Sequence, residues 1–332
     1  LAKKFNRAIL VTIEVDTHKD AYMLFESLNN RGIPLSSVDL IKNVLIAQAD
    51  LQSSAETTYE EWKAVLNNLG DNYVVQERFF RQYYNAFRDE LNKPNTKKKV
   101  VKKYPLGYLA TKTTILEIYE RLIKDNYKQF LLGITKAAKN YAILINNSET
   151  ACSYQDALIN LERIQGAPAY LLLLYLLENK ERLAVDDKQF EAIVIFLTKF
   201  FVRRNVTDIP NTRNLVKIFM DITDKLRSNA VSNVYEVITT KLKEVSATDD
   251  VFEEKIRGPI YQDNDMATRF ILCQIEEQHQ NKEIYRDFWE RTKDDKFVWT
   301  IEHIFPEGNR IPKPWVDMIA DGNTELAQEY LD

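Results

Sequence analysis

The sequence predicts a mainly α-helical protein in which a multi-helix domain makes up most of the chain. Glycine is scarce, with 8 in 332 residues, well under the usual share of ~7%. Apolar residues recur over long stretches at the three- and four-residue spacing that is typical of buried helix faces. The chain is long enough for two domains that each bury their own core.

Charge and cysteine content narrow the possible partners. The 45 basic and 49 acidic residues give a net charge of −4, so any contact with DNA must be local. Cys152 and Cys273 are too few for a disulfide framework or a zinc site, which fits a reducing cytoplasm. The most apolar run, residues 169–177, is far shorter than the ~20 residues that cross a bilayer. We expect a cytoplasmic protein with no membrane partner.

The beginning of the chain differs in style from the rest. Residues 8–15, AILVTIEV, are apolar and β-branched, which favours a strand. Residues 21–28 show helical spacing, and NNRG at 29–32 is typical of a helix end. Ser36 or Ser37 then caps a second helix. We expect a helix, a tight corner and a helix.

Polar side chains gather at this corner. This corner has more polar side chains than two short helices need, namely Asn29, Arg31, Asp39, Lys42 and Asn43. Asp39 stands three residues after Ser36, as in a short capping box. A guanidinium and an ammonium in one pocket suit a nucleotide phosphate or a DNA backbone. The sequence therefore predicts that Asn29, Arg31, Asp39 and Lys42 converge on one polar pocket.

Apolar periodicity predicts the helices of the main domain. The stretch at 114–146 is expected to break near Tyr127, and residues 169–177 are apolar all round, which places that helix in the middle of the domain. The helices are expected at 59–69, 74–91, 114–146, 157–165, 169–177, 190–201, 214–228, 231–245 and 265–280.

Two features of this domain each allow two interpretations. An aromatic face on the helix at 74–91 indicates core packing, with a stacking platform for bases as the alternative. The face consists of Phe79, Phe80, Tyr83, Tyr84 and Phe87. The pair Arg203 and Arg204 follows a buried helix and either clamps phosphate or, as we prefer, braces carboxylates within the domain.

The only concentrated basic run lies at residues 92–104. Its lysines can neutralise DNA phosphates without reading base sequence. The alternative, which we prefer, is a solvated loop. The lysines are Lys97, Lys98, Lys99, Lys102 and Lys103.

The last part of the chain carries an acid directly before a histidine, a pattern that suits catalysis or, as the alternative, a structural histidine at the end of a strand. Residues 297–306, FVWTIEHIFP, favour a strand because they are rich in β-branched and aromatic side chains. Glu302 stands directly before His303. Adjacent residues on a strand point to opposite faces, so joint action by this pair requires a twisted hairpin.

Residues 25–43 resemble the FE-x-LN-x-RG-x-x-L-x-x-x-DL-x-KN signature of GmrSD-type restriction endonucleases, the modification-dependent phage-defence enzymes of bacteria. The resemblance implies that residues 1–50 are the C-terminal part of a ParB-like α/β domain that senses nucleotide and modified DNA. It further implies a helical domain at 51–292 and the start of a His-Asn-His nuclease domain, of the ββα-metal class, at 293–332. The matching residues are Phe25, Glu26, Leu28, Asn29, Arg31, Gly32, Leu35, Asp39, Leu40, Lys42 and Asn43.

The resemblance also assigns roles. It implies that His303 is the general base of phosphodiester hydrolysis and that Glu302 is a ligand of a divalent metal, which we expect to be Mg²⁺. The implied partners are modified DNA and a nucleoside triphosphate. It also implies an arginine-aromatic-x-leucine helix at residues 269–272, and a tryptophan-containing helix after the histidine that begins near Trp315.

The sequence departs from the family pattern at both ends. A Gly-Gln-x-Arg motif that lies upstream in the family is not in this chain, and the chain stops at Asp332, before the family's distal Asn and Lys or His. We therefore expect the parent to be an endonuclease, and this stretch by itself to cleave DNA poorly. The alternative is a helical module that binds DNA or a protein without cutting. The modified base, the nucleotide and the oligomeric state stay open.

Overall fold

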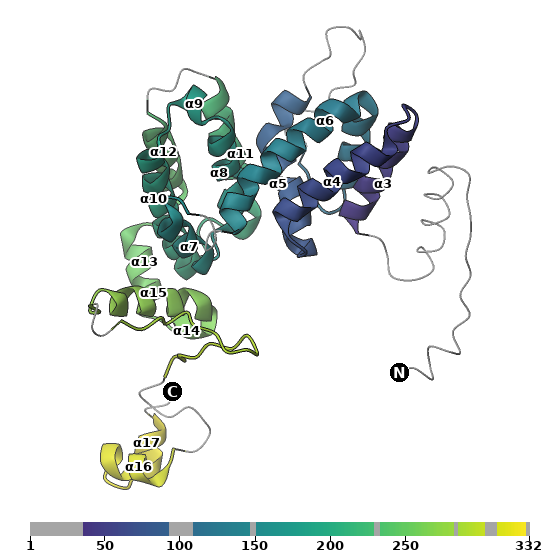
Figure 1. Cartoon of the computed structure of the whole chain (residues 1–332). Helices are drawn as coiled ribbons and strands as arrows, with labels where there is room; N and C mark the ends of the chain where they lie inside the picture. Colours follow the sequence, from purple (N-terminus) through teal and green to yellow (C-terminus); the bar gives the residue numbers. More distant parts are fainter. Residues whose placement is uncertain are drawn as a thin grey trace, which may run out of the picture. The chain divides into compact units, whose positions relative to one another are not determined.

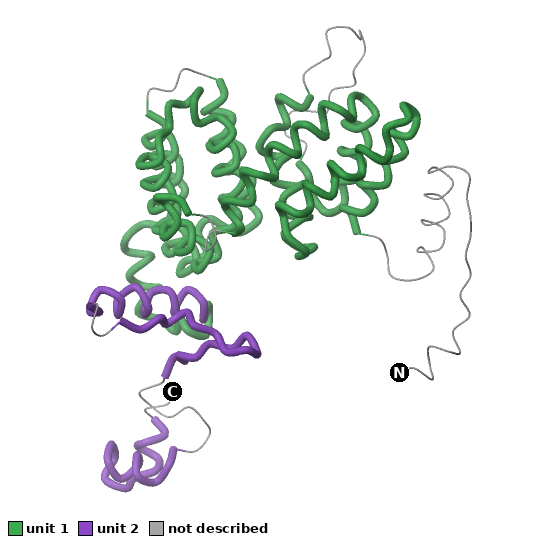
Figure 2. Tube along the Cα trace, in the orientation of Figure 1, with its two compact units in different colours: residues 1–264 green, residues 265–332 purple. Residues whose placement is uncertain are grey.

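The computed structural model describes residues 36–92, 109–146, 151–228, 233–281, 285–302 and 311–329. Within these ranges the chain forms helices joined by loops and has no regular β-strand (Figure 1). The prediction of a mainly α-helical protein is confirmed. The chain divides into two compact units, residues 1–264 and residues 265–332 (Figure 2). The predicted strand at 8–15 and the helix at 21–28 lie outside the described residues.

The described residues in the first part of unit 1 form α3 (Ser37–Asp50), α4 (Ala55–Leu69), α5 (Tyr73–Leu91) and α6 (Ile115–Ile145). Both α3 and α4 pack against α6. Helix α6 is interrupted at Asn126, whose φ of −157° and ψ of 87° are not helical. The predicted break near Tyr127 is confirmed.

Aromatic side chains form the core of this part. Four of the five residues of the predicted aromatic face are buried, namely Phe79, Phe80, Tyr83 and Tyr84. The ring of Phe80 stacks on Trp62 of α4 at a centroid distance of 5.4 Å, and Phe79 meets Tyr141 of α6 edge-on at 5.2 Å. Phe87 is half-buried. Because packing occupies these ring faces, the core interpretation holds and the stacking platform does not.

The rest of unit 1 is built around a helix that is buried on every side. All residues from Tyr170 to Leu177 of α8 are buried, which confirms the prediction for this apolar run. Helix α13 was not predicted, because none of its residues is buried and its 8 residues are too few to show a clear helical period. None of the described helices is long and apolar enough to span a bilayer. The elements are α7 (Gln155–Arg163), a 3₁₀ turn (Ala167–Ala169), α8 (Tyr170–Glu178), α9 (Lys180–Leu183), α10 (Asp187–Thr207), α11 (Thr212–Ser228), α12 (Val234–Val245), α13 (Asp249–Ile256) and α14 (Ile260–Asp263).

Unit 2 contains α15 (Asp265–Glu277), α16 (Lys313–Ala320) and α17 (Thr324–Glu329). Helices α16 and α17 share a small core of Val316, Ala320 and Ala327. Trp315 lies in α16, so the expected tryptophan-containing helix is present.

The strand predicted at 297–306 is not formed by its described part. Instead, an isolated antiparallel bridge joins Arg291 and Phe297, and the Val298 N–H donates to the Glu290 carbonyl at 2.9 Å. The strand prediction is therefore wrong for residues 298–302. Residues with strand propensity need a neighbouring strand to pair with, and here the chain folds back on itself in a tight turn instead.

Candidate functional site

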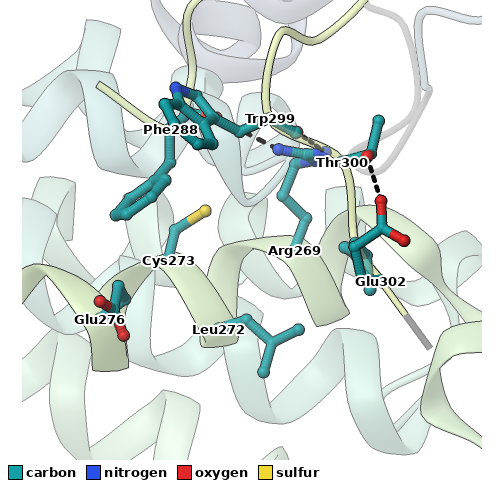
Figure 3. A pocket seen from close by; sticks show the side chains of 9 residues that line it. Arg269, Leu272, Cys273, Glu276, Phe288, Trp299, Thr300 and Glu302 are labelled. Carbon is teal, nitrogen blue, oxygen red and sulfur yellow. Dashed lines mark hydrogen bonds between the residues drawn. The ribbon is translucent and has the colours of Figure 1, made fainter. Parts of the chain in front are cut away.

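A buried arginine organises the segment that leads to the predicted catalytic pair. Arg269 of α15 is only 7% exposed. Its Nη1 donates to the Phe288 carbonyl at 3.2 Å, and its Nη2 donates to the Trp299 carbonyl at 2.6 Å (Figure 3). The guanidinium also lies over the Phe297 ring, 3.8 Å from its centroid. Since a buried cation is costly unless its hydrogen bonds are satisfied, these contacts stabilise both arms of the turn against α15.

Aromatic contacts support the same arrangement. Phe288 and Trp299, one from each arm, meet edge-on at 6.0 Å. Trp289 contacts Phe297 across the turn at 6.0 Å and Phe270 of α15 at 6.3 Å. The segment therefore has a defined conformation although it is neither helix nor strand.

A cavity of about 210 Å³ lies between α15 and this segment. Its wall on α15 includes Arg269, Cys273 and Glu276, and Glu302 lines the opposite wall (Figure 3). The Thr300 hydroxyl donates to Glu302 Oε1 at 2.8 Å. The exposed Glu302 carboxylate is thus held by one neutral hydrogen bond and keeps lone pairs for a cation or a hydrogen-bond donor.

The described residues supply one carboxylate of the predicted metal site. They contain no group of three or more His, Cys, Asp or Glu side chains that could hold a metal ion. Mg²⁺ is commonly held by one or two carboxylates together with water and substrate phosphates, and Glu302 fits such a site. His303 lies outside the described residues, so its role stays a prediction.

The polar corner of the signature is described in part. Ser36 caps α3 by accepting the Asp39 N–H at 3.0 Å, and its hydroxyl donates to the Asp39 carboxylate at 2.5 Å. Lys42 Nζ lies 3.3 Å from that carboxylate. Asp39 and Lys42 therefore face each other, and the capping prediction is confirmed. Asn29 and Arg31 lie outside the described residues, so the convergence of all four stays a prediction.

Of the remaining candidates, the structure decides between the interpretations of the arginine pair. Arg203 pairs with Asp249 at 2.6 Å, and Arg204 pairs with Asp208 at 2.5 Å. Both arginines brace carboxylates within unit 1, as preferred. The basic run from Lys97 to Lys103 lies outside the described residues.

A charged cluster that the sequence does not reveal joins α5 to α11. Arg227 of α11 pairs with Asp89 at 3.1 Å, Glu90 at 2.7 Å and Asp224 at 2.6 Å. Burial pushes the pKa of the Arg227 guanidinium down, but the hydrogen bond and charge of Glu90 outweigh it and raise this pKa above its ordinary value. Every charge of the cluster has a partner inside the unit, which indicates a structural role.

No family model, no curated protein and no solved structure matches the chain. The functional assignment therefore depends on the residues of the chain and on their geometry.

Proposed function

We propose that the chain is part of a nucleotide-dependent endonuclease of the GmrSD type, which cleaves modified foreign DNA by metal-assisted hydrolysis. The signature at 25–43 motivates the proposal. The observation that best supports the proposal is the hydrogen bond from the buried Arg269 to the Trp299 carbonyl. This bond holds the backbone three residues before Glu302, beside a cavity. In the proposal residues 1–50 belong to a ParB-like domain, residues 51–292 form the helical domain and residues 293–332 begin the nuclease domain.

The proposed chemistry divides between two adjacent side chains. Hydrolysis of a phosphodiester requires a base that takes a proton from water, and His303 is the proposed base. Glu302 would hold a divalent ion such as Mg²⁺, which would supply positive charge for the leaving oxygen. The Thr300 hydroxyl donates to the Glu302 carboxylate and so orients it. Arg269 acts as a positioning residue, since it binds the backbone and not the reacting groups.

Nucleotide and DNA recognition lie elsewhere in the proposal. Asn29, Arg31, Asp39 and Lys42 would bind a nucleotide phosphate or the DNA backbone. The lysines between 97 and 103 would add contacts to DNA phosphates that do not depend on base sequence.

A second candidate is a helical module that binds DNA or protein without cutting. The described ranges contain no group of three or more metal-binding side chains, and this second candidate requires none.

Cleavage assays on the longest natural chain that contains these residues distinguish the two candidates. His303→Ala should abolish cleavage of modified DNA and leave DNA binding and nucleotide hydrolysis intact, because proton abstraction acts only in the transition state. Glu302→Gln should also impair cleavage, with partial rescue by raised Mg²⁺. Glu276→Gln is the matched control, because it removes a carboxylate from the same cavity without touching the proposed base or metal ligand.

The proposal is wrong if His303→Ala retains cleavage and merely lowers the melting temperature. Equal loss of cleavage in Glu276→Gln and Glu302→Gln would also contradict the proposal. Removal of either carboxylate would then impair cleavage, and Glu302 would have no special role as a metal ligand.

A further inference from the structure

Unit 1 contains a second and larger cavity, of about 480 Å³, at the junction of α10, α12 and α13. Phe196, Lys199, Phe200 and Arg203 line it from α10. Their spacing of three, four and seven residues places all of them on one helix face. Lys243, near the end of α12, lines the cavity from the other side. One face of α10 thus contributes two aromatic side chains and two cationic side chains to the lining of this cavity.

The charge of this cavity is positive although the chain as a whole is acidic. Three cations and one carboxylate, Asp249, line it, and Asp249 already pairs with Arg203 at 2.6 Å. Arg203 Nη1 also donates to the Ala247 carbonyl at 3.1 Å, so the Arg203 guanidinium already binds residues of the cavity wall. Lys199 and Lys243 are exposed and form no ion pair within the described part of unit 1. Two positive charges are therefore left for a ligand.

The aromatic side chains make the inner wall apolar. Phe200 is 4% exposed and packs edge-on against Phe219, so it belongs to the core. Phe196 is half-buried, lines the cavity and contacts Tyr235 edge-on at 6.1 Å. The N-terminus of α13 adds no net attraction for an anion, because its first turn already carries Asp249 and Asp250.

We propose that this cavity binds a small organic phosphate that has an aromatic ring, such as a nucleoside triphosphate. Lys199 and Lys243 would hold the phosphates, and the ring would lie against Phe196. The volume falls in the range of about 300–1,000 Å³ that is usual for small-molecule sites, which favours a compact ligand over a DNA duplex. This inference goes beyond the proposed function, which places nucleotide recognition at residues 29–42, and the Arg31→Gln variant below distinguishes the two sites.

Binding of ATP to the 332-residue chain, measured by isothermal titration calorimetry, tests the site. Lys199→Gln/Lys243→Gln should weaken ATP binding about tenfold or more, as expected for the loss of two charge-assisted contacts. Lys188→Gln/Lys255→Gln is the matched control. It makes the same charge change with exposed lysines of α10 and α13 that do not line the cavity, and it should leave the affinity unchanged. Phe196→Leu should weaken ATP binding but not pyrophosphate binding.

Several results would overturn the assignment. ATP binding that is absent from the unaltered chain, or equal in the two double variants, removes the site. Loss of ATP binding in Arg31→Gln but not in Lys199→Gln/Lys243→Gln places the nucleotide at the signature corner. If pyrophosphate binds as tightly as ATP, the aromatic ring of the ligand has no role in binding. If Lys199→Gln/Lys243→Gln loses binding of duplex DNA but keeps binding of ATP, the two lysines belong to a DNA-binding surface.

Discussion

Replacement of Arg269 by methionine tests the contact that positions the segment before Glu302. Methionine keeps much of the length and the apolar stem of arginine but removes both hydrogen bonds to the Phe288 and Trp299 carbonyls. Hydrogen bonds from a charged group contribute about 1.5–3 kcal/mol each. Phe288 is half-buried and Trp299 is 36% exposed, so the released carbonyls regain water and the lower value applies. The expected loss is about 3 kcal/mol for opening of this segment.

Amide hydrogen exchange measures this local opening. Each change of about 1.4 kcal/mol in free energy alters an equilibrium constant tenfold. A loss of about 3 kcal/mol in the free energy of opening should therefore speed exchange at the Val298 amide about a hundredfold in Arg269→Met. In the native protein that amide donates to the Glu290 carbonyl. Exchange in the buried helix α8 of unit 1 should not change. Arg286→Met is the control, because Arg286 is exposed and lies 5.1 Å over the Trp299 ring without holding a carbonyl of the turn. Unchanged exchange at Val298 in Arg269→Met, or equal acceleration in both variants, would refute the reasoning.

Three further predictions concern unit 1. A Cβ at Gly133 of α6 would lie 2.6 Å from the Tyr83 hydroxyl, and that ring is 6% exposed and packed against Phe79. Gly133→Ala should therefore destabilise the protein by about 1–2 kcal/mol, because overpacking outweighs the helix propensity of alanine. In a Tyr83→Phe background, which lacks the hydroxyl, the same change should stabilise the protein. Chemical denaturation that shows the same sign of the change in both backgrounds contradicts this prediction. Burial raises the pKa of Tyr141 to about 12, so the folded state binds the phenolic proton more tightly than the unfolded state, and stability present below pH 10 should decline as the pH rises from 10 to 12. Tyr141→Phe should flatten that decline in melting temperature, and an unchanged slope would exclude Tyr141 as its source. Replacement of Lys97, Lys98, Lys99, Lys102 and Lys103 by glutamine should weaken DNA binding equally across sequences and reduce its salt dependence, whereas an unchanged salt slope would indicate a solvated loop.

Some parts of this protein follow from local sequence alone. The run from Tyr170 to Leu177 has no polar face, so it can only be stable in the interior, where the structure places it. The cap at Ser36 and the break near Tyr127 were also predicted, because capping and helix interruption depend on a few consecutive residues. Likewise, the aromatic face of α5 indicates burial through its spacing before its partners are known.

Tertiary structure alone decided how distant polar groups combine. Arg227 meets Asp89 and Glu90 across more than a hundred residues of chain, and no periodicity links a charge to a partner so far away. The described part of the strand predicted at 297–306 did not form, because the Trp299 carbonyl is bound by Arg269 of a helix and not by a neighbouring strand. The cavity at Lys199 and Lys243 likewise exists only because α10 and α12 pack together. Hydrophobic spacing along one helix determines which face is buried, but the geometry of packing between helices determines which charges share a site.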